Sequence, residues 1–105
     1  MEDKKEITYS EYVLLIKIYL IRKKLKYFTL SELGRMVGTP FSNPIMQNVK
    51  EICVDKNILN LERIEGRNHI YKLNAKNLSN LIRSSYIFNI TGNFIKANKP
   101  IDYNF

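Results

Sequence analysis

Segment 29–73 constrains the fold of this chain more than any other part, because it carries a dense series of helix and hairpin signals. Thr29 stands three residues before Glu32, which is the spacing of a capping box at the start of a helix. Helical spacing of apolar residues predicts a helix over residues 30–37, and Gly38 is typical of the residue that ends one. The inward residues expected on this helix are Leu30, Leu33, Met36 and Val37.

A second helix is predicted directly after a short turn. Pro40 lies in that turn and prevents the preceding helix from continuing. Asn43 is a typical helix cap, and Pro44 occupies the first helical position, where its missing N–H is not needed. Asn57 is expected to end this helix in the left-handed conformation. The inward stripe predicted from helical spacing consists of Ile45, Val49, Ile52 and Cys53.

A β-hairpin follows, with strands predicted over residues 60–65 and 69–73. Gly66 and Asn68 lie in the connection between the strands, and both residue types tolerate positive φ angles. The whole segment is therefore predicted to fold as a helix, a turn, a second helix and a two-stranded hairpin.

Residues 8–26 are predicted to form a long first helix, which Thr8 and Glu11 begin with another capping box. Residues 1–7 are largely charged and are expected to fray. Apolar residues cover most of the circumference of this helix, so it must be buried on more than one side. The second side is expected to contact another subunit, with a helix wrapped by its own chain as the alternative. The residues outside the main core-facing arc are Leu14, Ile18 and Ile21.

A further helix is predicted over residues 74–90, where apolar side chains recur at helical spacing. Gly92 is a stop signal, and residues 93–105 form a tail that either packs as an extended arm or stays loose. No linker composition divides the chain, so residues 1–105 are expected to form one domain. The residues of this helix that are expected to join the first helix in a dimer interface are Leu78, Leu81, Ile82 and Tyr86.

The charge of the chain favours a polyanionic partner. The 105 residues carry a formal net charge of +7, and the pI is about 9.6. The single cysteine, Cys53, excludes an internal disulfide, and no apolar run is long enough to span a bilayer. The expected compartment is a reducing cytoplasm, and no membrane partner is expected.

Three runs of the chain resemble a winged helix-turn-helix domain. Residues 28–38 (FTLSELGRMVG) resemble the first motif helix and its turn, residues 49–59 (VKEICVDKNIL) the end of the second motif helix, and residues 71–73 (YKL) the returning wing strand. The resemblance implies a mainly α fold with a small β-hairpin (α+β), in the order helix, helix, helix, wing, helix. Such domains include small dimeric repressors of bacteria and archaea and compact regulators of archaeal viruses.

The resemblance also implies where DNA would be contacted. In such domains the third helix lies in the major groove with its outward residues against base edges, and the wing contacts the minor groove or the backbone. The candidate DNA-binding residues implied on the helices and their turn are Arg35, Thr39, Ser42, Asn43, Gln47 and Lys50. The candidates implied on the wing are Arg63, Arg67, Asn68 and His69.

Several of these assignments have a simpler alternative. The polar face of the third helix can be a solvated surface, since its two lysines are balanced by Glu51 and Asp55. The basic cluster 22–26 either binds phosphate or complements the carbonyl end of the first helix. Arg67 can be an ordinary exposed turn residue, and Cys53 is most simply a small core residue.

The sequence contains no phosphate-binding glycine loop, metal-ligand spacing or catalytic constellation, so we expect no enzyme activity, cofactor or metal. The expected function is sequence-specific binding of double-stranded DNA by a homodimeric transcription regulator, which acts by occupying a promoter. The alternative is a winged helix used as a protein-interaction module in a replication or host–virus assembly. The third helix, which supplies no net positive charge, keeps that alternative open.

Overall fold

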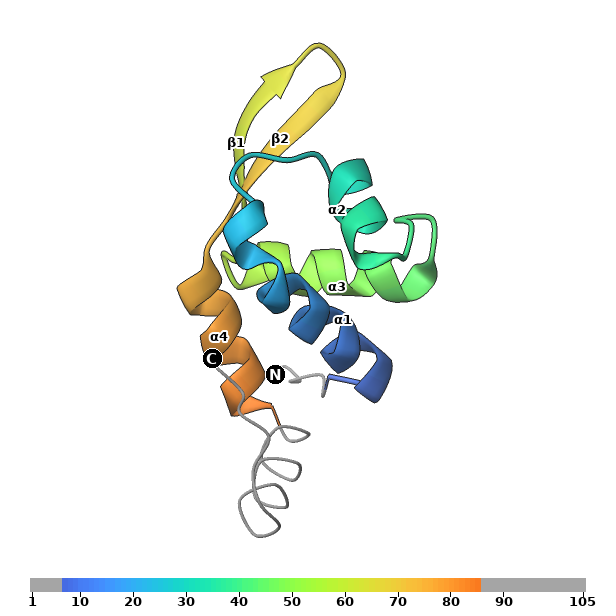
Figure 1. Cartoon of the computed structure of the whole chain (residues 1–105), viewed down its shortest axis with the longest axis vertical. Coiled ribbons are helices and arrows are strands. Elements are labelled where there is room, and N and C mark those ends of the chain that lie inside the picture. The colour runs from blue at the N-terminus through green and yellow to red at the C-terminus, as the bar shows by residue number, and fades with distance from the viewer. Residues whose placement is uncertain (1–6, 86–105) are drawn as a thin grey trace, which may run out of the picture.

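The computed structural model of the chain describes residues 7–85, which form four α-helices and one antiparallel β-hairpin (Figure 1). This confirms a mixed α+β fold. The elements in chain order are α1 (Tyr9–Leu20), η1 (Arg22–Lys24, a 3₁₀ turn), α2 (Leu30–Val37), α3 (Pro44–Asp55), β1 (Leu59–Glu65), β2 (Asn68–Leu73) and α4 (Ala75–Ser84).

The predicted starts of α1 and α2 are confirmed by their hydrogen bonds. The Thr8 hydroxyl accepts from the Glu11 amide at 3.2 Å, and the Glu11 carboxylate accepts from the Thr8 amide at 3.1 Å. Thr29 and Glu32 make the same reciprocal pair at 3.2 and 2.9 Å. Gly38 ends α2 in the left-handed conformation with φ of 79°. The two helix starts form at the positions predicted from the sequence because each capping-box hydrogen bond joins residues only three apart in the chain.

The first helix is shorter than predicted. α1 ends at Leu20, and the backbone then makes the 3₁₀ turn η1 in place of the predicted helix to residue 26. The Arg22 guanidinium donates to the Tyr19 carbonyl at 2.9 Å and lies 4.0 Å from the centre of the Tyr19 ring, which satisfies the end of the helix. The change of direction returns Leu25 and Phe28 to the core, where both are buried.

The start and stop of α3 are confirmed, but its inward stripe was predicted wrongly. The Asn43 side chain accepts from the Ile45 amide at 2.8 Å, and Asn57 has the expected positive φ of 58°. Met46, Val49 and Cys53 are the buried residues of the helix, while Ile45 is 36% exposed and Ile52 is partly exposed. Both stripes have helical spacing, so only the position of the neighbouring helices decides which one faces inward.

Two further residues of α2 differ from the prediction. Met36 is 42% exposed and Leu30 is only partly buried, whereas Leu33 and Val37 are buried as expected. An eight-residue helix buries only the narrow stripe that faces its neighbours, and Met36 lies outside that stripe.

The hairpin pairs Leu59 with Leu73 at its base and Glu65 with Asn68 at its tip. Gly66 and Arg67 form the connection, and Gly66 has a φ of 62°. The register shifts between Leu61 and Arg63, as in a β-bulge. The base of β2 is held by a third chain segment, because Phe28 and Tyr71 exchange backbone hydrogen bonds of 3.1 and 2.8 Å.

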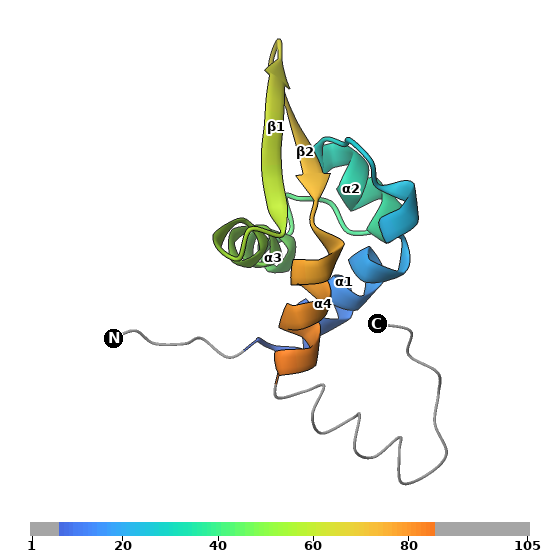
Figure 2. The same cartoon turned by 90° about the vertical axis from the view of Figure 1, so that its left-hand side faces the viewer.

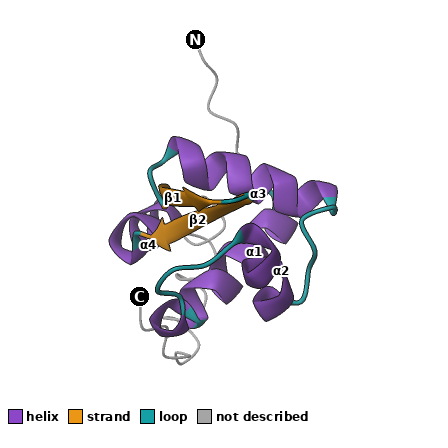
Figure 3. Cartoon of the chain, turned by 90° about the horizontal axis from the view of Figure 1, so that it is seen from above, coloured by secondary structure: helices purple, strands orange, loops and turns teal. Residues whose placement is uncertain are grey.

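The helices pack around α1, and the hairpin rises between α3 on one side and α1 and α2 on the other (Figures 2 and 3). α1 contacts α2, α3 and α4, so most of its wide apolar surface is covered by its own chain, and Tyr9 and Leu20 stay exposed. The predicted dimer interface is therefore wrong for most of its residues. Leu14 and Ile18 are 5% and 1% exposed, and Leu78 and Ile82 are fully buried. Ile21 and Leu81 are partly buried and pack against the same core, and Tyr86 lies outside the described residues.

The last described helix, α4, ends earlier than the predicted residue 90. Ser85 leaves the helix with an extended ψ of 149°. The hydroxyls of Ser84 and Ser85 donate to the carbonyls of Leu81 and Ile82 at 3.0 and 2.9 Å, which satisfies acceptors at the helix end. The remainder of the predicted helix (86–90), the predicted tail (93–105) and residues 1–6 lie outside the described residues. None of the helices within residues 7–85 has the length and apolar character needed to cross a membrane.

Candidate nucleic-acid interface

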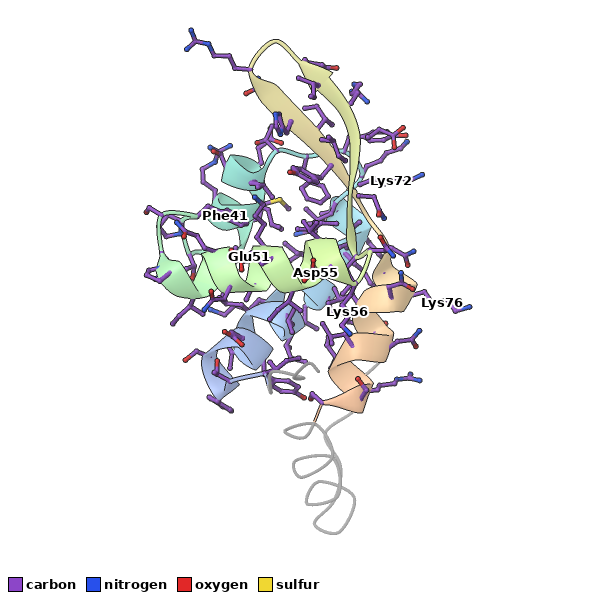
Figure 4. The ribbon with its side chains drawn as sticks, turned by 180° about the vertical axis from the view of Figure 1, so that it is seen from behind. Phe41, Glu51, Asp55, Lys56, Lys72 and Lys76 are labelled. Carbon is purple, nitrogen blue, oxygen red and sulfur yellow. The ribbon has the colours of Figure 1, made fainter. Side chains whose placement is uncertain are left out.

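The outer face of α3 is a mostly polar surface that the helix turns away from the core. It lies opposite the buried stripe formed by Met46, Val49 and Cys53. Figure 4 shows Glu51 and Asp55 on the side of α3 that faces away from α1. The exposed residues of this outer face are Gln47, Asn48, Glu51, Val54 and Asp55.

Gln47 has a structural contact in addition to its exposed position. Its Nε2 donates to the carbonyl of Phe41 at 3.1 Å, which ties the first turn of α3 to the preceding loop. The amide oxygen points to no hydrogen-bond donor among residues 7–85 and can accept from a ligand. Gln47 therefore combines a fixed side-chain position with a free acceptor, as a base-contacting residue requires.

The other predicted residues around α3 divide into caps and surface groups. Asn43 is a helix cap and is half-buried, so its oxygen is already used by the Ile45 amide. Ser42 is exposed just before α3. Thr39, in the turn between α2 and α3, and Lys50, within α3, are partly buried. Ser42, Gln47 and Lys50 lie within two turns of α3 and can contact one ligand together.

The remaining predicted residues lie on two separate parts of the molecule. Arg35 is exposed on α2. Arg67, Asn68 and His69 are exposed at the hairpin tip, which extends well beyond the helices in Figure 1. A ligand that contacts both α3 and the hairpin tip must therefore be long, which is true of a nucleic-acid duplex.

Arg63 has a structural role that the sequence did not indicate. Its Nε donates to the Glu65 carboxylate at 2.5 Å, and its guanidinium lies 5.2 Å from the centre of the Tyr27 ring. The hydrogen bond to Glu65 raises the pKa of Arg63. Because the charge of Arg63 is matched by a carboxylate on the same strand, this residue has less charge to offer an anion than Arg67.

The structure brings together three lysines that sequence reasoning did not select. Lys56, Lys72 and Lys76 come from the end of α3, from β2 and from the start of α4, and Figure 4 shows all three on the face that carries Glu51 and Asp55. The hairpin register, which pairs Asn60 with Lys72, returns β2 to the chain segment that follows α3, and no signal in the sequence marks this approach.

Cys53 is a core residue, and the described residues contain no cluster suited to a metal ion. The thiol is buried, and burial raises its pKa to about 12, so it stays protonated at neutral pH. Within residues 7–85 no three His, Cys, Asp or Glu side chains gather closely enough to hold a metal. We assign no nucleophile or metal ligand to these residues.

Comparisons of this chain with family models, with curated proteins and with solved structures found no match.

Proposed function

We propose that this protein is a sequence-specific double-stranded DNA-binding transcription regulator of winged helix-turn-helix type. In this proposal α2 and α3 are the helix-turn-helix, and the β1–β2 hairpin is the wing. The observation that carries the proposal is that α3 presents an exposed polar face beside a projecting hairpin whose tip carries an arginine. That order and placement of elements suits a helix in the major groove and a wing on the adjacent backbone or minor groove.

The outer face of α3 carries the chemistry needed to distinguish base pairs. The amides of Gln47 and Asn48 can pair with adenine, which presents an acceptor and a donor in the major groove. The carboxylate of Glu51 can accept from the N4 amino group of cytosine. These groups form different hydrogen bonds with different base pairs, so the proposed binding is sequence-specific.

Electrostatic attraction to DNA must come from groups beside the outer face of α3. Glu51 and Asp55 repel phosphates that approach the centre of that face. Arg35 on α2 and Arg67 at the hairpin tip are exposed on neighbouring elements and supply positive charge. In this proposal the flanking cations hold the duplex, and the α3 side chains select the sequence.

Regulation then requires no bond-making chemistry. A protein that occupies a promoter excludes or recruits other proteins by position alone. If two copies bind one operator, as the sequence analysis expects, they must contact each other through residues other than Leu14, Ile18, Leu78 and Ile82, which are core residues of a single chain.

Selection of bound fragments from a random DNA pool tests the proposal directly. We expect an enriched motif, and we expect electrophoretic mobility-shift assays to show that the motif competes better than random DNA. Affinity should fall steeply with salt, as it does for proteins that neutralise phosphates. A folded protein that binds no duplex even at low salt would reject DNA as its partner.

A protein-interaction module is the second candidate, and one observation favours it. Leu61 and Ile64 on β1 are 50% and 57% exposed. Leu61 pairs with Tyr71 and Ile64 with His69, and the bulge between Leu61 and Arg63 keeps both apolar side chains on one face of the hairpin. A double variant that carries Leu61→Ser and Ile64→Ser would keep its DNA binding if DNA is the partner. The same variant would lose complex formation with a partner protein if that apolar face binds a protein.

A further inference from the structure

Three lysines from three elements occupy one corner of the molecule, and the function proposed above does not require them. Lys56 is the C-cap residue of α3, Lys72 is the penultimate residue of β2, and Lys76 lies in the first turn of α4. Figure 4 shows their side chains on the same side of the molecule. We call Lys56, Lys72 and Lys76 the lysine patch.

Hydrogen bonds fix the elements of the lysine patch relative to one another. The Asn77 side-chain amide donates to the carbonyls of Lys56 and Asn57 at 3.3 and 3.2 Å, which ties α4 to the end of α3. The main-chain N–H of Asn74 donates to the main-chain carbonyl of Ile58 at 2.8 Å, which ties the start of α4 to the segment before β1. The three lysine backbones are therefore held in one rigid corner.

The charges of the lysine patch are available to a ligand. All three side chains are exposed, and within residues 7–85 none of them forms an ion pair or a side-chain hydrogen bond. Arg63 differs, because its guanidinium is paired with the Glu65 carboxylate. The positive end of the α4 dipole lies in the same corner and adds to the potential there.

An open hollow with both polar and apolar lining adjoins the lysine patch along α4. Its volume is about 350 Å³. The residues that line it are Lys56, Asn77, Asn80, Leu81 and Ser84. The basic corner and the hollow together form a surface that extends away from the outer face of α3 toward α4.

We propose that the lysine patch binds the phosphate backbone of the same DNA duplex whose groove α3 contacts, on the α4 side of that groove. This inference rests on the proposed function. Glu51 and Asp55 exclude phosphates from the centre of the α3 outer face, so the DNA strands must pass along its edges. At the C-terminal end of α3 the chain changes from Asp55 to Lys56, and the lysine patch is the cationic surface that a strand would meet there.

A charge-matched pair of variants of the full chain tests this proposal. The test variant carries Lys56→Gln, Lys72→Gln and Lys76→Gln. The control carries Lys4→Gln, Lys5→Gln and Lys17→Gln, which removes the same charge from residues outside the lysine patch and outside the basic cluster 22–26. Affinity for a duplex selected by the wild-type protein is measured over a range of salt concentrations, and the DNA backbone is mapped by hydroxyl-radical footprinting.

Each neutralised phosphate contributes about −0.9 to the slope of log affinity against log salt, so the test variant should lose about two to three units of slope. The control should lose less than about one unit. The test variant should also lose backbone protection on one flank of the footprint and keep protection at the centre. If the triple variant does not fold, each single substitution should make the slope shallower by about one unit.

Equal losses in the test variant and the control would overturn the proposal, because they would reflect net charge alone. A wild-type slope in a folded test variant would also overturn it and would leave the proposed function standing. A wild-type protein that binds no duplex would overturn both. Binding of an acidic protein that depends on the same three lysines, with unchanged DNA binding, would assign the lysine patch to that other partner.

Discussion

The side-chain amide of Gln47 donates to the main-chain carbonyl of Phe41 at 3.1 Å, so the residue that best fits a base contact also supports the turn before α3. This double role determines how a substitution should behave. Gln47→Ala should weaken binding to the selected site more than to random DNA by about 1–3 kcal/mol, because it removes a sequence-dependent hydrogen bond. The free energy of unfolding should fall by only about 1 kcal/mol, since the lost intramolecular bond is exposed.

Competition binding with selected and random duplexes measures the first effect, and chemical denaturation measures the second. Arg35→Ala is the matched control, because a phosphate contact should weaken both duplexes to a similar degree. An unchanged ratio of the two affinities in Gln47→Ala would show that α3 does not contact bases through this residue.

Gly34 tests the packing of the turn between α2 and α3. A Cβ atom at Gly34 would lie 2.9 Å from the Thr39 carbonyl oxygen and 3.3 Å from the Phe41 ring, so the turn would have to move. We expect Gly34→Ala to lower the free energy of unfolding by about 1–3 kcal/mol, as overpacking does. DNA affinity should fall as well, because the turn positions the first residues of α3.

Gly38→Ala separates packing from backbone strain. A Cβ at Gly38 would meet no atom within 4 Å, but its φ of 79° disfavours an L side chain. This variant should cost about 1 kcal/mol of stability and should leave the position of the turn unchanged. A Gly34→Ala protein as stable as the wild type would contradict the close approach of the turn to α2.

Leu14 tests whether α1 is covered by its own chain. Leu14→Ala should lower the free energy of unfolding by about 2–5 kcal/mol, because it leaves a cavity in the core. The loss should be the same at every protein concentration, since no subunit contact is broken. Thermal unfolding over a hundredfold range of protein concentration measures this.

Leu20→Ala provides the control on the same helix, because Leu20 is 69% exposed and its truncation should change stability by less than about 0.5 kcal/mol. A destabilisation of Leu14→Ala that diminishes as the protein is concentrated would restore a dimer interface on this face of α1.

Arg67 tests the hairpin as a wing. Its side chain projects from the two-residue connection between Glu65 and Asn68, where it supports no packing. Arg67→Ala should make the slope of log affinity against log salt shallower by about one unit per bound chain, with the melting temperature unchanged. Arg63→Ala should change the slope less, because Glu65 already neutralises that guanidinium. If Arg67→Ala keeps the wild-type slope, the hairpin does not touch DNA.

Local interactions made the helix starts predictable from the sequence. The capping boxes at Thr8 and Thr29 and the proline at the start of α3 act within three or four residues, so they form wherever those residues occur. The hairpin was predictable for a similar reason, because Gly66 marks its tip and apolar and polar residues alternate around it.

The inward faces of the helices were not determined locally. Ile45 and Met46 are neighbours in the sequence and both are apolar, yet only Met46 is buried. The breadth of the apolar surface on α1 predicted contacts on several sides but could not distinguish a second subunit from α2, α3 and α4 of the same chain. That choice depends on how the helices pack together.

Short-range signals in the sequence set where most elements begin and which residues form the hairpin tip. The packing of helices and strands places Leu14 and Ile18 in the core of one chain and brings Lys56, Lys72 and Lys76 to one corner. Lys56 and Lys72 are separated along the chain by β1 and most of β2, and only the pairing of the strands and the Asn77 hydrogen bonds bring the three lysines together.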